Sequence, residues 1–236
     1  MASRFDRMEL LIGSDGLDRL QAASVAVFGV GGVGSYAVEA LARAGVGRLT
    51  LVDFDNVCLT NINRQIHALE ETVGRPKAEA MAERCRAINP QVDVSAVAER
   101  YSSDNSKELL AHPFDFVCDC IDDISAKLHL LQSCFQQKLP VISSMGAANK
   151  LDPAQVQVAD LAKTTKCRLA RIIRKELRKQ GIEKGIRVVF STEEFRPLDS
   201  AEGERKPLLG SSSWLPPIFG LTMASEVIRT LIGEID

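Results

Sequence analysis

Apolar and polar positions along the chain alternate between short apolar runs and segments with helical spacing. The runs typical of buried strands fall at 25–28, 49–52, 92–97, 114–120, 140–144 and 156–158. Helical spacing is found at 7–12, 16–22, 34–44, 76–88, 125–138 and 218–231. Strands that alternate with helices predict a Rossmann-like α/β fold, with a mostly parallel twisted sheet, helices on both faces, and a smaller C-terminal extension with added strands.

The segment 22–65 combines a strand, a glycine turn, a helix and a second strand. The turn has the order GxGGxG, with glycines at Gly29, Gly31, Gly32 and Gly34. Glycines let backbone amides approach a phosphate at a helix N-terminus. Asp53 ends the second strand, where an acid can bind a ribose hydroxyl. The segment therefore predicts a nucleotide site.

The glycine pattern alone fits an NAD site as well as an ATP site. The polar residues that follow favour ATP, because a triphosphate needs cations for its phosphates and a carboxylate for its metal. These residues are Asp55, Asn61, Arg64 and Lys77. Taken singly, Arg64 and Lys77 also fit solvated surface charges.

Acids cluster after the strand expected at 114–120. Asp119, Asp122 and Asp123 lie at or beyond its carboxyl end, where open α/β sheets bind ligands. Three acids so close together predict that at least one lies near a metal ion.

Five motifs then occur in one order along the chain: GxGGxGS, DFD, TNxxRQ, GxPKAE and CID. In this order they resemble the adenylating enzymes of the ThiF/MoeB family, Rossmann-like dimers that join AMP to a carboxylate. The resemblance implies ATP and Mg²⁺ as cofactors and leaves a monovalent cation open. It implies nucleotide contacts by Gly32, Asp53, Asn61, Arg64 and Lys77.

The same resemblance assigns two further residues. Asp122 would help to position Mg²⁺, a role that Asp123 could share. Arg7 matches the arginine that family members send into the partner subunit's site, which implies a homodimer. On sequence alone, a surface charge on a mobile tail is the favoured interpretation of Arg7.

No zinc is expected, because none of the six cysteines forms a CxxC pair, and many sulfur-pathway members of the family carry two such pairs. The cysteines are Cys58, Cys85, Cys118, Cys120, Cys134 and Cys167. Reduced thiols fit a cytoplasmic protein.

Length and composition favour one globular domain of 236 residues, since no linker rich in Pro, Gly or Ser divides the chain. We expect an N-terminal helical arm at 1–21, a nucleotide-binding part at 22–145, and a substrate-binding and crossover part at 146–236. Hydrophobic residues make up 45% and charged residues 25%, which is far from disorder. The longest apolar run is too short for a membrane helix and the N-terminus lacks a signal peptide's apolar core, so we expect a cytoplasmic protein with no membrane partner.

The net charge of −2 conceals one strongly basic segment. Residues 163–187 hold ten Lys or Arg against two Glu, a formal charge of +8, and the rest of the chain carries −10. Leu169, Ile172, Ile173 and Leu177 recur at helical spacing, so a helix could dock this apolar stripe and expose its cations. Such a face suits a phosphate backbone, although a merely solvated helix has the same pattern. The candidate nucleic-acid contacts are Lys163, Lys166, Arg168, Arg171, Arg174, Lys175, Arg178 and Lys179.

Four passages, NRQIHAL, AERCRAINP, MGAANKLDP and VQVADLAKT, resemble one branch of the family, the tRNA threonylcarbamoyladenosine dehydratases. That resemblance implies tRNA carrying threonylcarbamoyladenosine as the substrate, activation of its carboxylate, and ring closure. The alternative is an activating enzyme for the C-terminal glycine of a ubiquitin-like sulfur-carrier protein, and a sulfur-transfer partner stays open. A catalytically silent nucleotide sensor is a third possibility, which the joint retention of the motif residues argues against.

The last part of the chain holds a polar stretch at 199–206 and a Ser-rich turn at 210–217. No cysteine falls in that turn, so nothing visible requires a thioester intermediate. Trp214 fits either a base-stacking residue or a packed indole.

Overall fold

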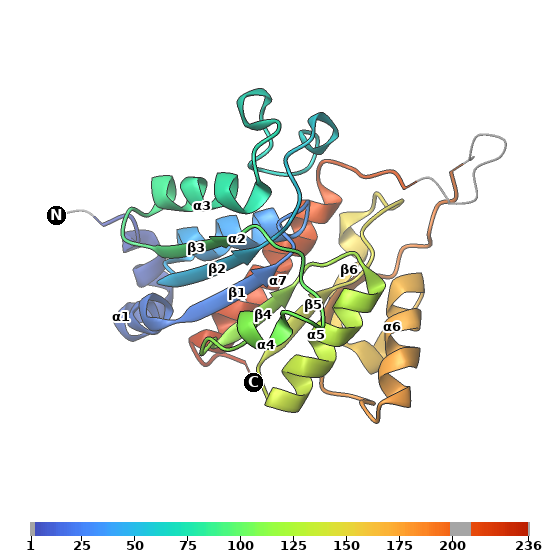
Figure 1. Cartoon of the computed structure of the whole chain (residues 1–236). Helices are drawn as coiled ribbons and strands as arrows, with labels where there is room; N and C mark the ends of the chain where they lie inside the picture. The colour runs from blue at the N-terminus through green and yellow to red at the C-terminus, as the bar shows by residue number, and fades with distance from the viewer. Residues whose placement is uncertain (1–2, 199–208, 236) are drawn as a thin grey trace.

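The computed structural model of the chain describes residues 3–198 and 209–235, so the polar stretch expected at 199–206 lies outside the described residues. The described strands form one sheet in the order β3-β2-β1-β4-β5-β7-β6 (Figure 1). Neighbouring strands are parallel except β6 and β7, which are antiparallel. The strands are β1 (Ser24–Phe28), β2 (Arg48–Val52), β3 (Asp93–Val97), β4 (Phe116–Asp119), β5 (Val141–Ser144), β6 (Val156–Asp160) and β7 (Arg187–Ser191). The predicted Rossmann-like, mostly parallel fold is confirmed.

Helices cover both faces of the sheet (Figure 1). One group packs on the face behind β1 and β2 in that view: α1 (Asp6–Ala22), α2 (Gly34–Ala44), α3 (Lys77–Ile88) and α7 (Leu215–Leu231). The other group packs on the opposite face: α4 (Ser106–Leu109), α5 (Ile124–Gln137) and α6 (Arg168–Lys179). No helix among the described residues is long and apolar enough to cross a membrane.

Strand β1 separates two hydrophobic cores. Val25 and Val27 join the core under α2, α3 and α7, while Ala26 and Phe28 join the core under α5 and α6. Every residue of β1 is buried. A strand buried on both faces reads as a continuous apolar run, which is why its position was predictable.

Element boundaries differ from the expectations at a few places. The two N-terminal helical patches join as α1, with a break at Gly13, whose φ of 76° is not helical. Pro76 precedes the first residue of α3 instead of lying in its first turn. Helix α7 begins at Leu215, earlier than the expected 218, because Pro216 and Pro217 fit the first turn of a helix.

His67 is buried, and neither nitrogen of its ring has a hydrogen-bond partner among residues 3–198 and 209–235. Burial, and then the positive charges of Lys77 and Arg84, lower the pKa of His67 from 6.5 to about 4. The folded chain therefore disfavours the imidazolium form that the unfolded chain adopts below its own pKa.

This lowered pKa predicts acid sensitivity. The stability contributed by neutral His67 should be complete above about pH 6.5 and should fall as the pH decreases towards 4, because only the unfolded chain then binds the proton. A His67→Leu variant should be spared about 2.5 kcal/mol of the stability that the wild type loses between pH 7 and pH 4.5. Urea unfolding at the two pH values measures this, and equal losses in both proteins would contradict it.

Candidate functional site

Two adjoining hollows open beyond the carboxyl ends of the central strands. The small hollow, of about 100 Å³, lies between the ends of β1, β2 and β4 and is lined by residues that include Gly29, Asp53, Asp55 and Lys77. The large cavity, of about 380 Å³, is lined by residues that include Gly32, Arg64, Lys150 and residues 144–148. Gly31, Cys120, Ile121 and Asp122 line both. A ligand could therefore extend from one into the other across this shared wall.

The glycine turn brings three backbone segments into contact. A Cβ atom on Gly34 would lie 1.8 Å from the carbonyl oxygen of Gly29, and one on Gly29 would lie 2.7 Å from the carbonyl oxygen of Cys120. Only glycine fits these distances, and Gly29 also has a φ of 88°. Helix α2 begins at Gly34, and the residues just before it, Gly31, Gly32 and Val33, line the large cavity. The N-terminus of α2 therefore lies beside this cavity, a place that suits an anion.

Asp53 is held by two backbone amides. Its Oδ2 accepts from Val30 N at 2.6 Å and its Oδ1 accepts from Asp55 N at 2.9 Å. Burial raises the pKa of Asp53, while these hydrogen bonds and Lys77 oppose the shift. The carboxylate is thus fixed in the wall of the small hollow, where it can accept a hydrogen bond from a sugar hydroxyl.

Lys77, at the first position of α3, is buried and pairs with Asp55 across 2.8 Å. Asn61 is also buried, and its Oδ1 accepts from Cys58 N at 3.0 Å, which stabilises the 3₁₀ turn Leu59–Asn61. Asn61 lines neither hollow. Within the described residues, Lys77 is therefore the one Lys or Arg in the lining of the small hollow, and Asn61 supports the loop that follows β2.

Arg64 lies on the other side of the glycine turn. Its Cγ and Cδ lie beside Gly32. Its Nη1 donates to Thr60 O at 2.9 Å and to Asn63 Oδ1 at 2.8 Å, which fixes the guanidinium group. Gln65, to which the sequence interpretation gave no role, is buried beside Gly31, and its Oε1 has no partner among the described residues. An unsatisfied buried acceptor at the glycine turn is a further candidate ligand contact.

The three clustered acids have different environments. Asp119 is fully buried and Asp123 caps α5, with its Oδ1 accepting from Ala126 N at 2.8 Å. Asp122 is exposed in the shared wall and makes no hydrogen bond or ion pair within the described part of the chain. No group of three metal-ligating side chains occurs in that part either. A magnesium ion would fit Asp122 only if a ligand supplied further oxygens, as nucleotide phosphates do.

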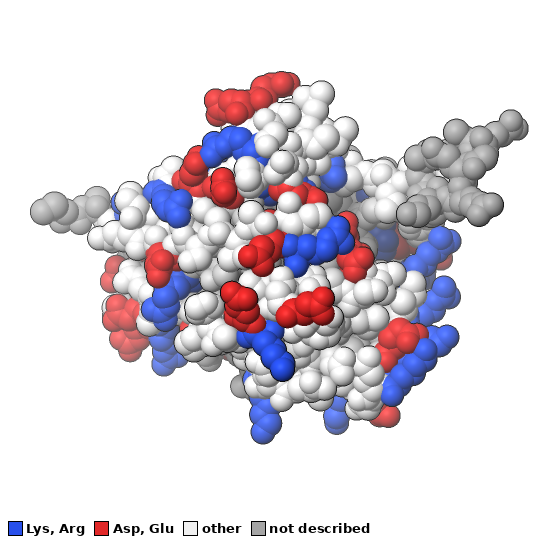
Figure 2. Space-filling view, viewed as in Figure 1, with Lys and Arg blue, Asp and Glu red and all other residues white. Residues whose placement is uncertain are grey.

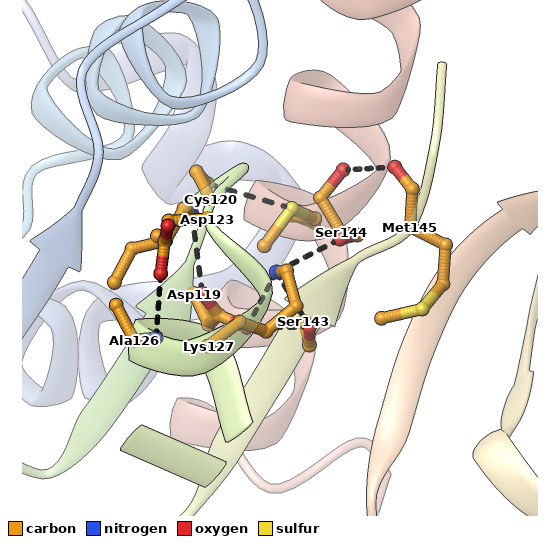
Figure 3. A network of polar contacts seen from close by, with 10 residues as sticks. Asp119, Cys120, Asp123, Ala126, Lys127, Ser143, Ser144 and Met145 are labelled. Carbon is orange, nitrogen blue, oxygen red and sulfur yellow. Dashed lines mark hydrogen bonds and ion pairs between the residues drawn. The ribbon is translucent and has the colours of Figure 1, made fainter. Parts of the chain in front are cut away.

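A buried polar network lies beneath this wall (Figure 3). Lys127 Nζ donates to Asp119 Oδ2 at 2.6 Å and to Ser144 O at 3.1 Å, and Ser143 Oγ donates to Asp119 Oδ2 at 2.6 Å. The sequence interpretation missed it, because a lysine in an amphipathic helix is ordinarily assigned to the solvent face. The signal was present, since Lys127 shares helical spacing with Leu130, Leu131 and Cys134, all of them buried.

Helix α6 buries Ala170, Ile173 and Leu177, while Ile172, also counted in the predicted stripe, is 39% exposed. Arg174 is half-buried, and its Nη1 donates to Leu161 O and to both oxygens of Thr164. Its guanidinium group therefore fastens the turn before α6. The other seven candidate cations are exposed: Lys163, Lys166, Arg168, Arg171, Lys175, Arg178 and Lys179. Figure 2 shows Lys and Arg side chains along the edge that α6 occupies in Figure 1.

The seven exposed cations form a basic face, and this face borders the large cavity. Lys166 and Arg168 belong to the cavity wall, and Arg168 stacks over the ring of Phe195 at 4.4 Å from its centroid. Trp214 is 46% exposed, and its Nε1 donates to Leu151 O at 2.8 Å. Arg7 is exposed on α1 and lines neither hollow of its own chain.

Comparisons with known proteins agree with this arrangement. The ThiF family model matches residues 5–236. The tRNA threonylcarbamoyladenosine dehydratase of Bacillus subtilis is 43% identical over 249 residues, covering 100% of this chain and 97% of the relative. The Escherichia coli enzyme of the same name is 44% identical, covering 98% of this chain and 94% of the relative. The crystal structure of E. coli tRNA N6-threonylcarbamoyladenosine dehydratase, TcdA, in complex with ATP superposes with a TM-score of 0.90 at 38% identity, over 98% of this chain and 94% of that one.

The close backbone approach at the glycine turn predicts a large effect of one methyl group. Gly34→Ala should destabilise the fold by about 2–4 kcal/mol, because its Cβ can be accommodated only if the Gly29 carbonyl moves. Gly146→Ala, whose Cβ would have its nearest neighbour at 3.9 Å, is the matched control and should unfold like the wild type. Urea unfolding midpoints measure both, and equal midpoints would refute the steric argument.

Proposed function

The chain belongs to the ThiF family, and on this basis we propose that it catalyses the ATP-dependent dehydration of N6-threonylcarbamoyladenosine in tRNA, through adenylation of the carboxylate of that group. One observation carries the proposal: the hollow lined by Gly29, Asp53 and Lys77 shares a wall with a second cavity, whose lining includes Arg168 at the start of the basic helix α6. The whole chain, 1–236, would act as one adenylating domain, since strands from both its parts join one sheet.

ATP would lie with its ribose at Asp53 and its α-phosphate at the amides near Gly32 and the N-terminus of α2. Arg64 and Lys77 flank this position and would contact the triphosphate, and Asn61 would support the turn just before Arg64. Asp122 would hold Mg²⁺ together with phosphate oxygens and water. When bound, the ion would neutralise charge that develops on the phosphates.

The substrate carboxylate would enter from the large cavity. Its oxygen attacks the α-phosphorus, and pyrophosphate leaves while Arg64 and Lys77 stabilise the charge of the transition state. The urea nitrogen of the same substrate then attacks the activated acyl carbon, AMP leaves, and the N–H proton passes to solvent. Because this second step is intramolecular, positioning alone accelerates it.

A covalent thioester is not needed for this sequence. Cys120 lies in the shared wall, but burial raises the pKa of its thiol well above the ordinary value. A protonated thiol is a poor nucleophile. The urea nitrogen of the substrate takes that role instead.

The tRNA would lie along α6, with phosphates contacting its exposed cations. Lys166 and Arg168 belong to both this basic face and the cavity wall, so the modified adenosine could turn into the cavity while the backbone stays on the helix. This continuity and the full-length match to the dehydratases favour tRNA over a sulfur-carrier protein. Since ATP and tRNA are both cytoplasmic, the reaction fits the predicted location.

Exposed apolar side chains support a homodimer. Leu10 and Leu11 on α1 are 80% and 79% exposed and stand close in sequence to Arg7. Leu59, Leu69 and Val73 are exposed on the loops between β2 and α3, which rise above the sheet in Figure 1. Apolar side chains of this size on a surface are typical of interfaces. In such a dimer Arg7 would reach the partner's site. This is compatible with its exposed position, since Arg7 lines neither hollow of its own chain.

The decisive assay supplies ATP and tRNA that carries threonylcarbamoyladenosine. The protein should convert the nucleoside to a product lighter by one water and release one AMP and one pyrophosphate for each conversion. Mass spectrometry of nucleosides and a pyrophosphate assay measure this. Pyrophosphate release with a sulfur-carrier protein and none with the modified tRNA would favour the alternative function.

Loss of charge at the nucleotide should abolish the reaction. Lys77→Ala and Asp122→Ala should each lower kcat by roughly a hundredfold or more, because they remove electrostatic stabilisation of the transition state. Asp123→Asn is the matched control, since asparagine can still cap α5. Near wild-type kcat in Lys77→Ala or Asp122→Ala would refute the assignment, and a hundredfold loss in Asp123→Asn would show that Asp123 shares the metal.

The basic face should control the salt dependence of tRNA binding. Replacing Arg171, Arg178 and Lys179 by alanine should flatten the slope of log affinity against log salt by about 0.7 to 0.9 for each lost phosphate contact. Arg174→Ala should instead lower the melting temperature, because it frees the turn at 161–164. If the triple variant kept the wild-type salt slope, the cations of α6 would be solvated and would not contact tRNA phosphates.

A further inference from the structure

Asp119, Lys127 and Ser143 are each fully buried, and they join β4, α5 and β5 at the floor of the site (Figure 3). Asp119 and Ser143 are register partners between the two strands. The ammonium group of Lys127 contacts both side chains, at 2.6 Å from Asp119 Oδ2 and 3.2 Å from Ser143 Oγ, and it also donates to Ser144 O. One buried cation therefore connects the ends of two adjacent strands.

The first of these strand ends leads to Asp122. Asp119 Oδ1 accepts from Ile121 N at 3.1 Å, so the carboxylate that pairs with Lys127 also holds the backbone just before Asp122. On the other side, Asp123 caps α5, and Lys127 N donates to Asp123 O at 3.0 Å. The contacts form a closed ring around the short turn that presents Asp122. The Asp123 end is held by main-chain and capping hydrogen bonds, and the Ile121 end is held by the Asp119 carboxylate, which the ammonium group of Lys127 fixes in turn.

The second strand end leads to the large cavity. Ser144 is the last residue of β5, and residues 144–148 form part of the cavity wall. The hydrogen bond from Lys127 to Ser144 O therefore fixes this wall relative to the turn with Asp122. In the proposed reaction, the turn with Asp122 faces the metal and the phosphates, and residues 144–148 face the acyl substrate.

Stability alone does not explain a charge at this place. Burying two ions is costly, and an apolar pair of similar volume often gives an equally stable fold. The sheet pairing of β4 with β5 and the packing of Leu130, Leu131 and Cys134 under α5 already join these elements. What the ion pair adds is two directed hydrogen bonds, one accepted by Asp119 from Ile121 N and one donated by Lys127 to Ser144 O, and an apolar pair would lack both.

We propose that Lys127 is a positioning residue for adenylation: through Asp119 and Ser144 it holds Asp122 at a fixed place relative to residues 144–148 of the cavity wall. The proposal rests on the function proposed above. Small displacements of a reacting group lower rates strongly, since a shift of about 1 Å can reduce a rate by a hundredfold. Loss of the network should therefore lower kcat and leave the binding of ATP at Asp53 little changed.

Two double variants test this directly. Asp119→Leu with Lys127→Met replaces the network by apolar side chains, whereas Asp119→Asn with Lys127→Gln removes both charges and keeps an acceptor for Ile121 N and a donor for Ser144 O. The measurements are kcat and KM for ATP in pyrophosphate release with threonylcarbamoylated tRNA, and the melting temperature. The apolar variant should fold, lose tenfold or more in kcat, and keep KM for ATP within about threefold. The polar variant should retain more of kcat than the apolar one.

Two results would overturn the proposal. The first is an apolar variant that folds with a kcat within threefold of the wild type, and the second is equal losses of kcat in both folded variants. If the apolar pair does not fold, Lys127→Arg decides, because it keeps the charge but places its donors differently against Ser144. A loss of threefold or more at the wild-type melting temperature supports positioning, and a smaller loss refutes it. A wild-type protein that releases no pyrophosphate would instead refute the proposed function.

Discussion

The close approach of three backbone segments governs the architecture of the site. The carbonyl oxygen of Gly29 occupies the space that a side chain on Gly34 would need, and the carbonyl of Cys120 does the same for Gly29. On the far side of α2, a Cβ atom on Gly220 would lie 2.2 Å from Val33 O, so α7 packs against the start of α2 equally closely. The N-terminus of α2 is thereby enclosed between β4 and α7. An anion placed there meets amides whose positions the fold does not allow to vary.

The architecture of the site also depends on two groups of charged side chains with different positions. Asp53, Lys77 and Asp122 lie in the walls of the site, whereas Asp119, Lys127 and Arg174 hold the segments that form those walls. The two groups are connected, because Asp119, the last residue of β4, accepts a hydrogen bond from Ile121 N in the turn that carries Asp122. A substitution at one of the supporting residues can thus alter the chemistry without touching a residue in the wall of the site.

The sequence allowed prediction of those features that depend on local pattern. Glycine spacing and Asp53 predicted the nucleotide site because a strand, a tight turn and a helix are short-range structures. The burial of Lys127 and the turn-fastening role of Arg174 depend on contacts with β5 and with residues 161–164, which no local pattern specifies. Strand β7 was not predicted, because its first residue, Arg187, was counted as part of the basic segment. The buried residues 188–190 that follow were therefore not recognised as a strand. The dual position of Lys166 and Arg168 likewise required the folded chain.

The shared wall has a kinetic consequence for the proposed reaction. Because Gly31, Cys120, Ile121 and Asp122 border both hollows, a mixed anhydride formed across them would occupy both at once. Neither half could then dissociate before the bond between them broke. The intermediate would be committed to ring closure and protected from loss into solution, and the AMP and the cyclised nucleoside would become separate products only after that bond is gone. The geometry of this wall would thus set the fraction of consumed ATP that leads to the cyclised product.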